Sequence, residues 1–92
     1  MTFFFTWDAA KASANRRKHG ISFENAFTAF TDPYARITDD PDHSESEERE
    51  ILLGSSSRGQ IVVVSFVQRE SAIRVISARR ATRKERNAYE EK

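Results

Sequence analysis

Two strand-like runs decide the fold: QIVVVSFVQ at residues 60–68 and AIRVISARR at residues 72–80. The first run is apolar at consecutive positions, which is typical of a central strand that is covered on both faces. The second run has the residue types of a strand, and Glu70 and Ser71 turn the chain between the two. These runs predict two neighbouring strands, around which the rest of the chain is arranged.

The segments on either side predict further strands and three helices. Asp8, Ser22 and Thr82 suit helix starts, and Thr82 forms a capping-box pattern with Glu85. Gly20 suits the left-handed backbone that ends a helix. We therefore expect helices from Asp8 to about His19, from Phe23 to about Phe30, and from Thr82 to about Glu91. We expect the remaining strands at residues 2–7, 34–38 and 49–56, and a turn at residues 57–59.

Length and composition indicate one small domain, residues 1–92. The chain has no cysteine, which excludes a disulfide framework and a thiolate metal site. No apolar run approaches the roughly 20 residues that span a bilayer, and we expect a cytoplasmic protein. The expected fold class is α+β: a small antiparallel sheet with two N-terminal helices and one C-terminal helix.

The net charge of +1 hides a strong separation of charge along the chain. Residues 39–50 carry seven acids and one base, whereas residues 69–92 carry eight bases and four acids. Arginine outnumbers lysine by 11 to 4, and its planar guanidinium group binds phosphate oxygens in pairs. The basic C-terminal part therefore predicts a phosphate-bearing partner, with RNA as our first choice.

The arginines of the last strand are expected to fall on different faces. In a regular strand, Arg74 and Arg80 share one face while Arg79 lies on the other, unless a β-bulge re-aims one of them. A solvated ion pair with the acidic segment is the alternative role for any single arginine. As a cluster, they favour phosphate binding.

Other charged residues have chemistry suited to a reaction on RNA. Lys18 and His19 end the first helix, where a protonated imidazole is favoured and suits a general acid, or else only caps the helix. Glu48 precedes Arg49 at a strand start, which holds a carboxylate better than a loop does. The acidic segment alternatively binds a hard cation, although its spacing matches no EF-hand.

The aromatic residues predict mostly core positions. Trp7, Phe27 and Phe30 are expected to pack inside the protein. Tyr89 lies on a short basic helix, where it either packs the helix down or presents its hydroxyl group.

Several motifs occur together over nearly the whole chain. Residues 7–26 contain W-D-x-x-K-x-x-x-N-x-x-K-H-G-I-S-F-E-x-A, and D-P follows at residues 32–33. D-x-S-x-x-E-E-R at residues 42–49, G-x-S-x-R-G at 54–59 and I-R-V-I-S-A-R-R-A-T-x-x-E-x-x-x-Y at 73–89 complete the set. In this combination the chain resembles the BrnT family of bacterial toxins. One stretch departs, because the family often has Tyr-Thr-Glu-Arg where this chain has FVQR at residues 66–69.

The resemblance implies a fold like that of the RelE-type ribonuclease toxins and cleavage of RNA that stops translation. It implies a BrnA-like antitoxin with a ribbon-helix-helix domain, through which the complex binds operator DNA. It also suggests a homodimer. The family's polar or charged positions correspond to Lys18, His19, Glu48, Arg49, Arg58, Arg74, Arg79 and Tyr89.

The resulting hypothesis is a metal-independent endoribonuclease without a cofactor, which needs a base, an acid and cations around the phosphate. Glu48 is the candidate base, and His19 or Lys18 the candidate acid. The residues assigned to catalysis are Lys18, His19, Glu48, Arg58, Arg74 and Arg79, and those assigned to RNA binding are Arg49, Arg80, Arg83 and Tyr89. The alternatives are a non-catalytic module that binds nucleic acid or protein through the same surface, and a metal-dependent nuclease centred on the acidic segment.

Overall fold

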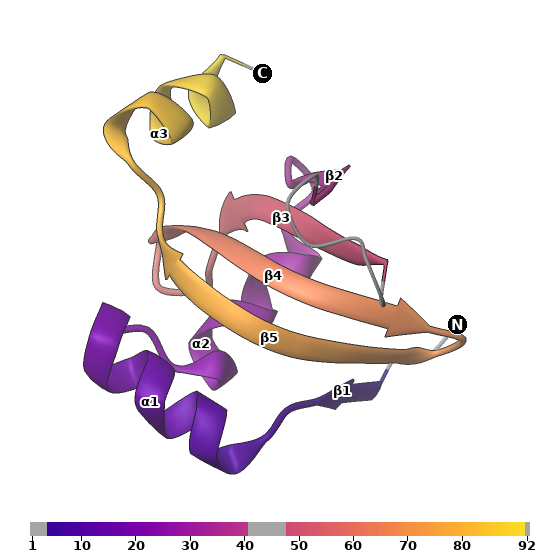
Figure 1. Ribbon diagram of the computed structural model, residues 1–92. Helices are drawn as coiled ribbons and strands as arrows, with labels where there is room; N and C mark the ends of the chain where they lie inside the picture. The colour runs from indigo at the N-terminus through magenta and orange to yellow at the C-terminus, as the bar shows by residue number, and fades with distance from the viewer. Residues whose placement is uncertain (1–3, 41–47, 92) are drawn as a thin grey trace.

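The computed structural model describes residues 4–40 and 48–91, which form a five-stranded sheet with two helices on one face and a third helix that follows the last strand (Figure 1). The strands are β1 (Phe4–Thr6), β2 (Arg36–Asp39), β3 (Arg49–Ser55), β4 (Ile61–Arg69) and β5 (Ala72–Arg80). The helices are α1 (Ala9–His19), α2 (Phe23–Phe27) and α3 (Arg83–Glu90), and the 3-10 turn η1 (Thr28–Thr31) follows α2. The α+β class is confirmed, although the predicted second helix tightens into the 3-10 turn after Phe27.

The sheet has the order β1-β5-β4-β3-β2. Strands β2 to β5 form an antiparallel meander, as predicted. The predicted antiparallel sheet is confirmed for these four strands, whereas β1 pairs in parallel with β5. This pairing arises because α1 and α2 carry the chain from one edge of the sheet to the other before β2 begins, and a parallel pair needs such a crossover.

The predicted starts of the three helices and the predicted end of the first helix at Gly20 are confirmed. Asp8 accepts a hydrogen bond from the first turn of α1, and Gly20 ends that helix with a φ of 72°. Ser22 caps α2 in the same way. At α3, Thr82 and Glu85 form the full capping box. Within residues 4–40 and 48–91, no helix is long and apolar enough to cross a membrane.

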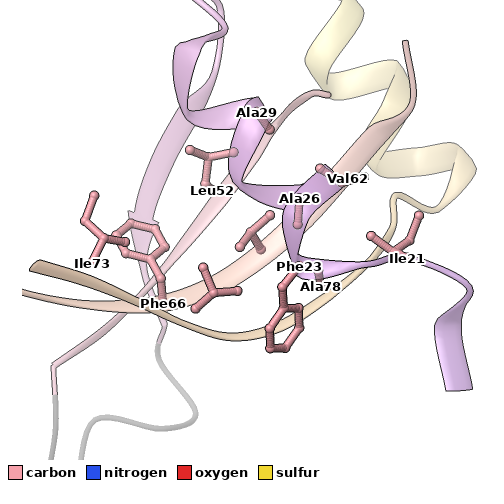
Figure 2. Close-up of a cluster of buried hydrophobic side chains, with 11 residues drawn as sticks. Ile21, Phe23, Ala26, Ala29, Leu52, Val62, Phe66, Ile73 and Ala78 are labelled. Carbon is pink, nitrogen blue, oxygen red and sulfur yellow. The ribbon is translucent and has the colours of Figure 1, made fainter. Parts of the chain in front are cut away.

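The hydrophobic core lies between the sheet and the α1–α2 layer (Figure 2). Phe23 and Phe66 are its largest buried side chains, at 0% and 1% exposure. Phe30 packs edge-on against Phe66, with ring centroids 5.0 Å apart. Trp7 contacts Phe23 and Phe27, so the expected packing of the three aromatic residues is confirmed. Phe66 stands where the resemblance leads one to expect a tyrosine, and its burial makes it a core residue of this chain.

A β-bulge interrupts the pairing of β4 with β5. Ser65 lies opposite Ser77, but Phe66 lies opposite Val75, so Ile76 has no partner of its own on β4. A bulge of this kind shifts the alternation of side chains by one residue. In β5, the alternation of core-facing and outward-facing side chains is therefore offset by one residue after the bulge.

The bulge brings Arg74 and Arg79 to the same face of the sheet. Arg74 lies opposite Val67 and Arg79 lies opposite Val63, and these two valines alternate onto one side of β4. Their side is the one away from α2, because the alternate residues of β4 form the core. The separation expected from a regular strand is therefore absent, and the alternative that a β-bulge re-aims one arginine is the one that the structure has. Arg80 points to the other side.

Candidate active site

A groove of about 470 Å³ lies on the face of the sheet opposite to the core. Its floor consists of small and aliphatic side chains from the three central strands, namely Ile51, Val63, Ser65, Ile76 and Ser77. Five charged or titratable residues line the same groove: Lys18, His19, Asp40, Arg49 and Arg79. The groove thus unites four of the predicted site residues, which come from α1, β3 and β5.

Asn15 brings the end of α1 to this groove. Its side-chain amide donates to the Ala78 carbonyl oxygen at 2.8 Å and accepts from the Ala78 backbone N–H at 3.1 Å. It also donates to the Ile21 carbonyl oxygen at 3.0 Å. Since β1 pairs with β5 only as far as Arg74, the Asn15 amide takes the place of a neighbouring strand at the free edge of β5. Lys18 and His19, one turn further on, are thereby fixed at the rim of the groove.

Arg79 is held in the groove by α3. Its guanidinium group donates to both carboxylate oxygens of Glu85, at 2.8 and 3.0 Å. The same carboxylate accepts from the Thr82 backbone N–H at 2.8 Å, so one side chain completes the helix cap and orients the arginine. The bond from Arg79, together with the Thr82 amide, lowers the pKa of Glu85 to about 2, and the carboxylate in turn raises the pKa of Arg79.

Because the pKa of Glu85 is lowered on folding, the stability that the Arg79–Glu85 pair contributes depends on pH. The pairing stabilises the fold fully above the ordinary carboxyl value of about 4.5, and it is lost as the pH falls from there toward 2. At neutral pH the Arg79 side chain is therefore oriented, charged and still 41% exposed, so a phosphate group can reach it.

Asp40 is a member of the groove that the sequence analysis missed. It was grouped with the solvated acidic segment, yet it is only 7% exposed. Its backbone N–H donates to the Arg49 carbonyl oxygen at 2.9 Å, which extends the pairing of β2 with β3 by one residue. The signal in the sequence was its position two residues after the end of a predicted strand. The rest of that segment, residues 41–47, lies outside the described residues, and so do most of the residues of the alternative cation site.

Other predicted catalytic residues lie outside the groove. Glu48 is exposed and directly precedes β3. Arg58 follows the end of β3 and lines a separate hollow with Arg16 and Gln60. Arg74 lines a third hollow, beside Thr6 and Val67. It shares a face with Arg79, but their partners on β4 are four residues apart, which corresponds to about 13 Å along the strand.

The residues predicted to bind RNA are also divided. Arg49 lies in the groove, whereas Arg80 and Arg83 line a hollow at the other side of the β5 end. Tyr89 is buried, and its hydroxyl group donates to the Asp32 carboxylate at 2.5 Å. Of the two roles expected for Tyr89, the structure therefore has the one in which the side chain packs the helix down.

Asp32 joins α3 to the body of the protein. The carboxylate oxygen that accepts from Tyr89 also accepts from the Ser55 backbone N–H at 2.8 Å, at the end of β3. Its other oxygen accepts from the Tyr34 backbone N–H at 2.9 Å. Together with the Arg79–Glu85 pair, this network fixes both ends of α3 over the sheet.

The Tyr89→Phe variant is expected to lose about 1–3 kcal/mol of unfolding free energy at pH 7, because it removes a hydrogen bond to a charged group. Hydrogen bonding to Asp32 and burial raise the pKa of Tyr89 to about 12. The native chain should therefore lose this stabilisation as the pH rises from about 10 to 12, whereas the variant has none to lose. Urea unfolding at pH 7 and pH 11 measures both effects. Equal pH dependence of the two proteins would contradict the assignment.

Comparison with known proteins identifies relatives of this chain. The model of a family described as "Ribonuclease toxin, BrnT, of type II toxin-antitoxin system" matches residues 7–85. Among solved structures, the chain is similar to the crystal structure of the Brucella abortus ribonuclease toxin BrnT, with a TM-score of 0.60 and 27% identity. That similarity covers 89% of this chain and 100% of the Brucella chain. No curated protein gives a significant match.

Proposed function

The chain belongs to the BrnT family of ribonuclease toxins of type II toxin–antitoxin systems, and from that premise we propose that its groove is the catalytic site of a metal-independent endoribonuclease. The observation that carries this proposal is the convergence of Lys18, His19, Asp40, Arg49 and Arg79 in one groove. Cations, a carboxylate and an imidazole are the groups that RNA cleavage without a metal requires.

In the proposed reaction, the 2′-oxygen of the RNA attacks the adjacent phosphorus atom. A base takes the proton of the 2′-hydroxyl group, the bond to the 5′-oxygen breaks, and an acid protonates that leaving oxygen. The products are a 2′,3′-cyclic phosphate and a free 5′-hydroxyl group. Negative charge gathers on the phosphate oxygens in the transition state, where fixed cations lower the barrier most.

We assign Arg79 and Arg49 to the phosphate oxygens and His19 to the leaving oxygen, with Lys18 as the alternative acid. Asp40 replaces Glu48 as the first candidate for the base, because Asp40 is buried in the groove and Glu48 is exposed outside it. The fixed position of Arg79 supports its role, since the Glu85 pair prepares its orientation before RNA binds.

The residues outside the groove receive other roles in this proposal. Arg58 and Arg74 line separate hollows, so we assign them to RNA backbone away from the reacting phosphate. Tyr89 is assigned to the packing of α3, in place of its predicted contact with RNA.

An antitoxin partner follows from the family. We propose that it is BrnA-like, carries a ribbon-helix-helix domain, and neutralises the toxin by covering the basic groove. Acidic side chains of the antitoxin would then pair with Arg49 and Arg79, which favours specific association. In the free toxin, RNA cleavage would stop translation. The homodimer and the cytoplasmic location remain predictions.

The direct test is cleavage of a labelled single-stranded RNA by the purified chain in excess EDTA. We expect cleavage products with 2′,3′-cyclic phosphate ends, and no cleavage of DNA of the same sequence, because DNA lacks the 2′-hydroxyl nucleophile. The His19→Ala variant should cleave about 100 to 10,000 times more slowly, the usual contribution of a general acid. Cleavage that stops in EDTA, or products that lack the cyclic phosphate, would contradict the proposed chemistry.

A further inference from the structure

We propose that a second site, which we call the arginine hollow, binds the RNA backbone outside the catalytic groove. The hollow has a volume of about 430 Å³ and lies between α3 and the turn that joins β3 to β4. The side chains of Arg80, Arg83 and Arg86 line it, together with Gln60 and Asn87. This inference rests on the proposed ribonuclease function and adds a binding site to it.

The charges of the hollow indicate an anionic ligand. Its lining has three arginines but only one acid, Glu90. Within the described part of the chain, Arg80, Arg83 and Arg86 have no carboxylate as a hydrogen-bond or ion-pair partner. Like charges that converge without partners repel one another, and an anion bound between them removes that cost.

The other groups of the hollow favour a phosphate backbone over a protein partner. Guanidinium groups bind phosphate oxygens with two parallel hydrogen bonds, and the amides of Gln60 and Asn87 add polar contacts. The Gln60 side chain is held by the Asn25 amide at 2.6 Å, so it is fixed before a ligand arrives.

The arginine hollow and the catalytic groove meet at the end of β5, on opposite sides of the strand. Arg79 and Arg80 are neighbours in the chain, yet Arg79 lines the groove and Arg80 lines the hollow. In this proposal, an RNA strand whose reacting phosphate lies at Arg79 crosses from one side of the sheet to the other beside this end of β5. Gln60 also lines the hollow of Arg16 and Arg58, so a third group of cations adjoins the arginine hollow. Single-stranded RNA, with its flexible backbone, can follow such a path.

The test compares RNA substrates of two lengths. In the Arg83→Ala/Arg86→Ala double variant, kcat/KM for a single strand of roughly 16 nucleotides should fall about tenfold or more. The decrease on a trinucleotide should be several times smaller, because a trinucleotide has too few phosphate groups to occupy the catalytic groove and the arginine hollow together. The salt dependence of long-RNA binding in EDTA should also weaken, by about 0.7 in logarithmic slope for each phosphate group that the variant no longer neutralises.

The Lys84→Ala variant is the matched control. Lys84 lies between the two arginine positions on the same exposed helix, but it does not line the arginine hollow. The control removes the same type of charge, and its kinetics on both substrates should stay close to those of the native chain. Circular dichroism of all variants checks that α3 remains folded.

Two results would overturn the arginine hollow while leaving the ribonuclease function intact. One is an equal decrease of kcat/KM on the long and the short RNA. The other is unchanged RNA binding together with weaker inhibition by the antitoxin, which would assign the hollow to the protein partner. If the native chain cleaves no RNA, the proposed function fails, and the salt dependence of RNA binding still decides whether the hollow contacts the backbone.

Discussion

The Arg79→Ala variant is expected to cleave RNA about 100 to 1,000 times more slowly than the native chain, the usual cost of removing one group that stabilises transition-state charge. The guanidinium group is the oriented cation of the groove, since Glu85 fixes it through two hydrogen bonds. Single-turnover rates at saturating RNA measure the effect on the chemical step. Toxicity on expression in cells should fall in parallel.

Arg74→Ala is the control for the Arg79 prediction. Both residues lie on β5 and on the same face of the sheet, but Arg74 lies outside the groove. Its removal should weaken RNA binding and leave the single-turnover rate within about tenfold of the native value, a change of at most about 1.4 kcal/mol in the barrier. Loss of the Arg79–Glu85 pair should cost about 1 kcal/mol of stability or less, so the Arg79 variant stays folded. Equal rates for the two variants would refute the assignment of the catalytic groove.

Replacing Asn15 with aspartate is expected to lower the unfolding free energy by about 3–5 kcal/mol at pH 7, as when a buried charge is left without a partner. The Asn15 amide donates to two carbonyl oxygens, those of Ile21 and Ala78. A carboxylate cannot donate, and at 7% exposure water gives it little compensation. Urea unfolding followed by circular dichroism measures the change.

The Ala14→Asp variant is the control for the Asn15 prediction. Residue 14 is exposed on the same turn of α1, so the new charge there should change the stability by only about 0.5 kcal/mol. The destabilisation by Asn15→Asp should also shrink at acid pH, where a protonated carboxyl group can donate one hydrogen bond. A small destabilisation by Asn15→Asp at neutral pH would show that the amide does not hold α1 against β5.

The order of the elements could be predicted because their signals are local. Asp8, Ser22 and Thr82 accept hydrogen bonds from the backbone amides of the helices that they begin. A run of consecutive apolar residues is typical of a central strand that is covered on both faces. The bulge in β5 has no such signal. Ile73 to Arg80 reads as a regular strand, and only its pairing with β4 shows that Ile76 is an extra residue. The regular alternation of side chains along a strand therefore predicted different faces for Arg74 and Arg79, although the two side chains share one face.

Only some residues of the catalytic groove could be predicted, because contacts between distant parts of the chain bring these residues together. Lys18, His19 and Arg79 were recognisable by their chemistry, but their meeting depends on the long-range bonds of Asn15 to Ala78. Asp40 resembles its acidic neighbours in sequence, and its burial comes from tertiary packing. Arg58 had the right chemistry, yet the turn after β3 carries it to another hollow.

The double use of the Glu85 carboxylate has a consequence for local unfolding. The same group completes the capping box of α3 and orients the guanidinium group of Arg79. The Tyr89–Asp32 bond holds the later part of that helix. Unfolding of α3 alone, with the sheet intact, would therefore release Arg79 from its fixed orientation in the groove.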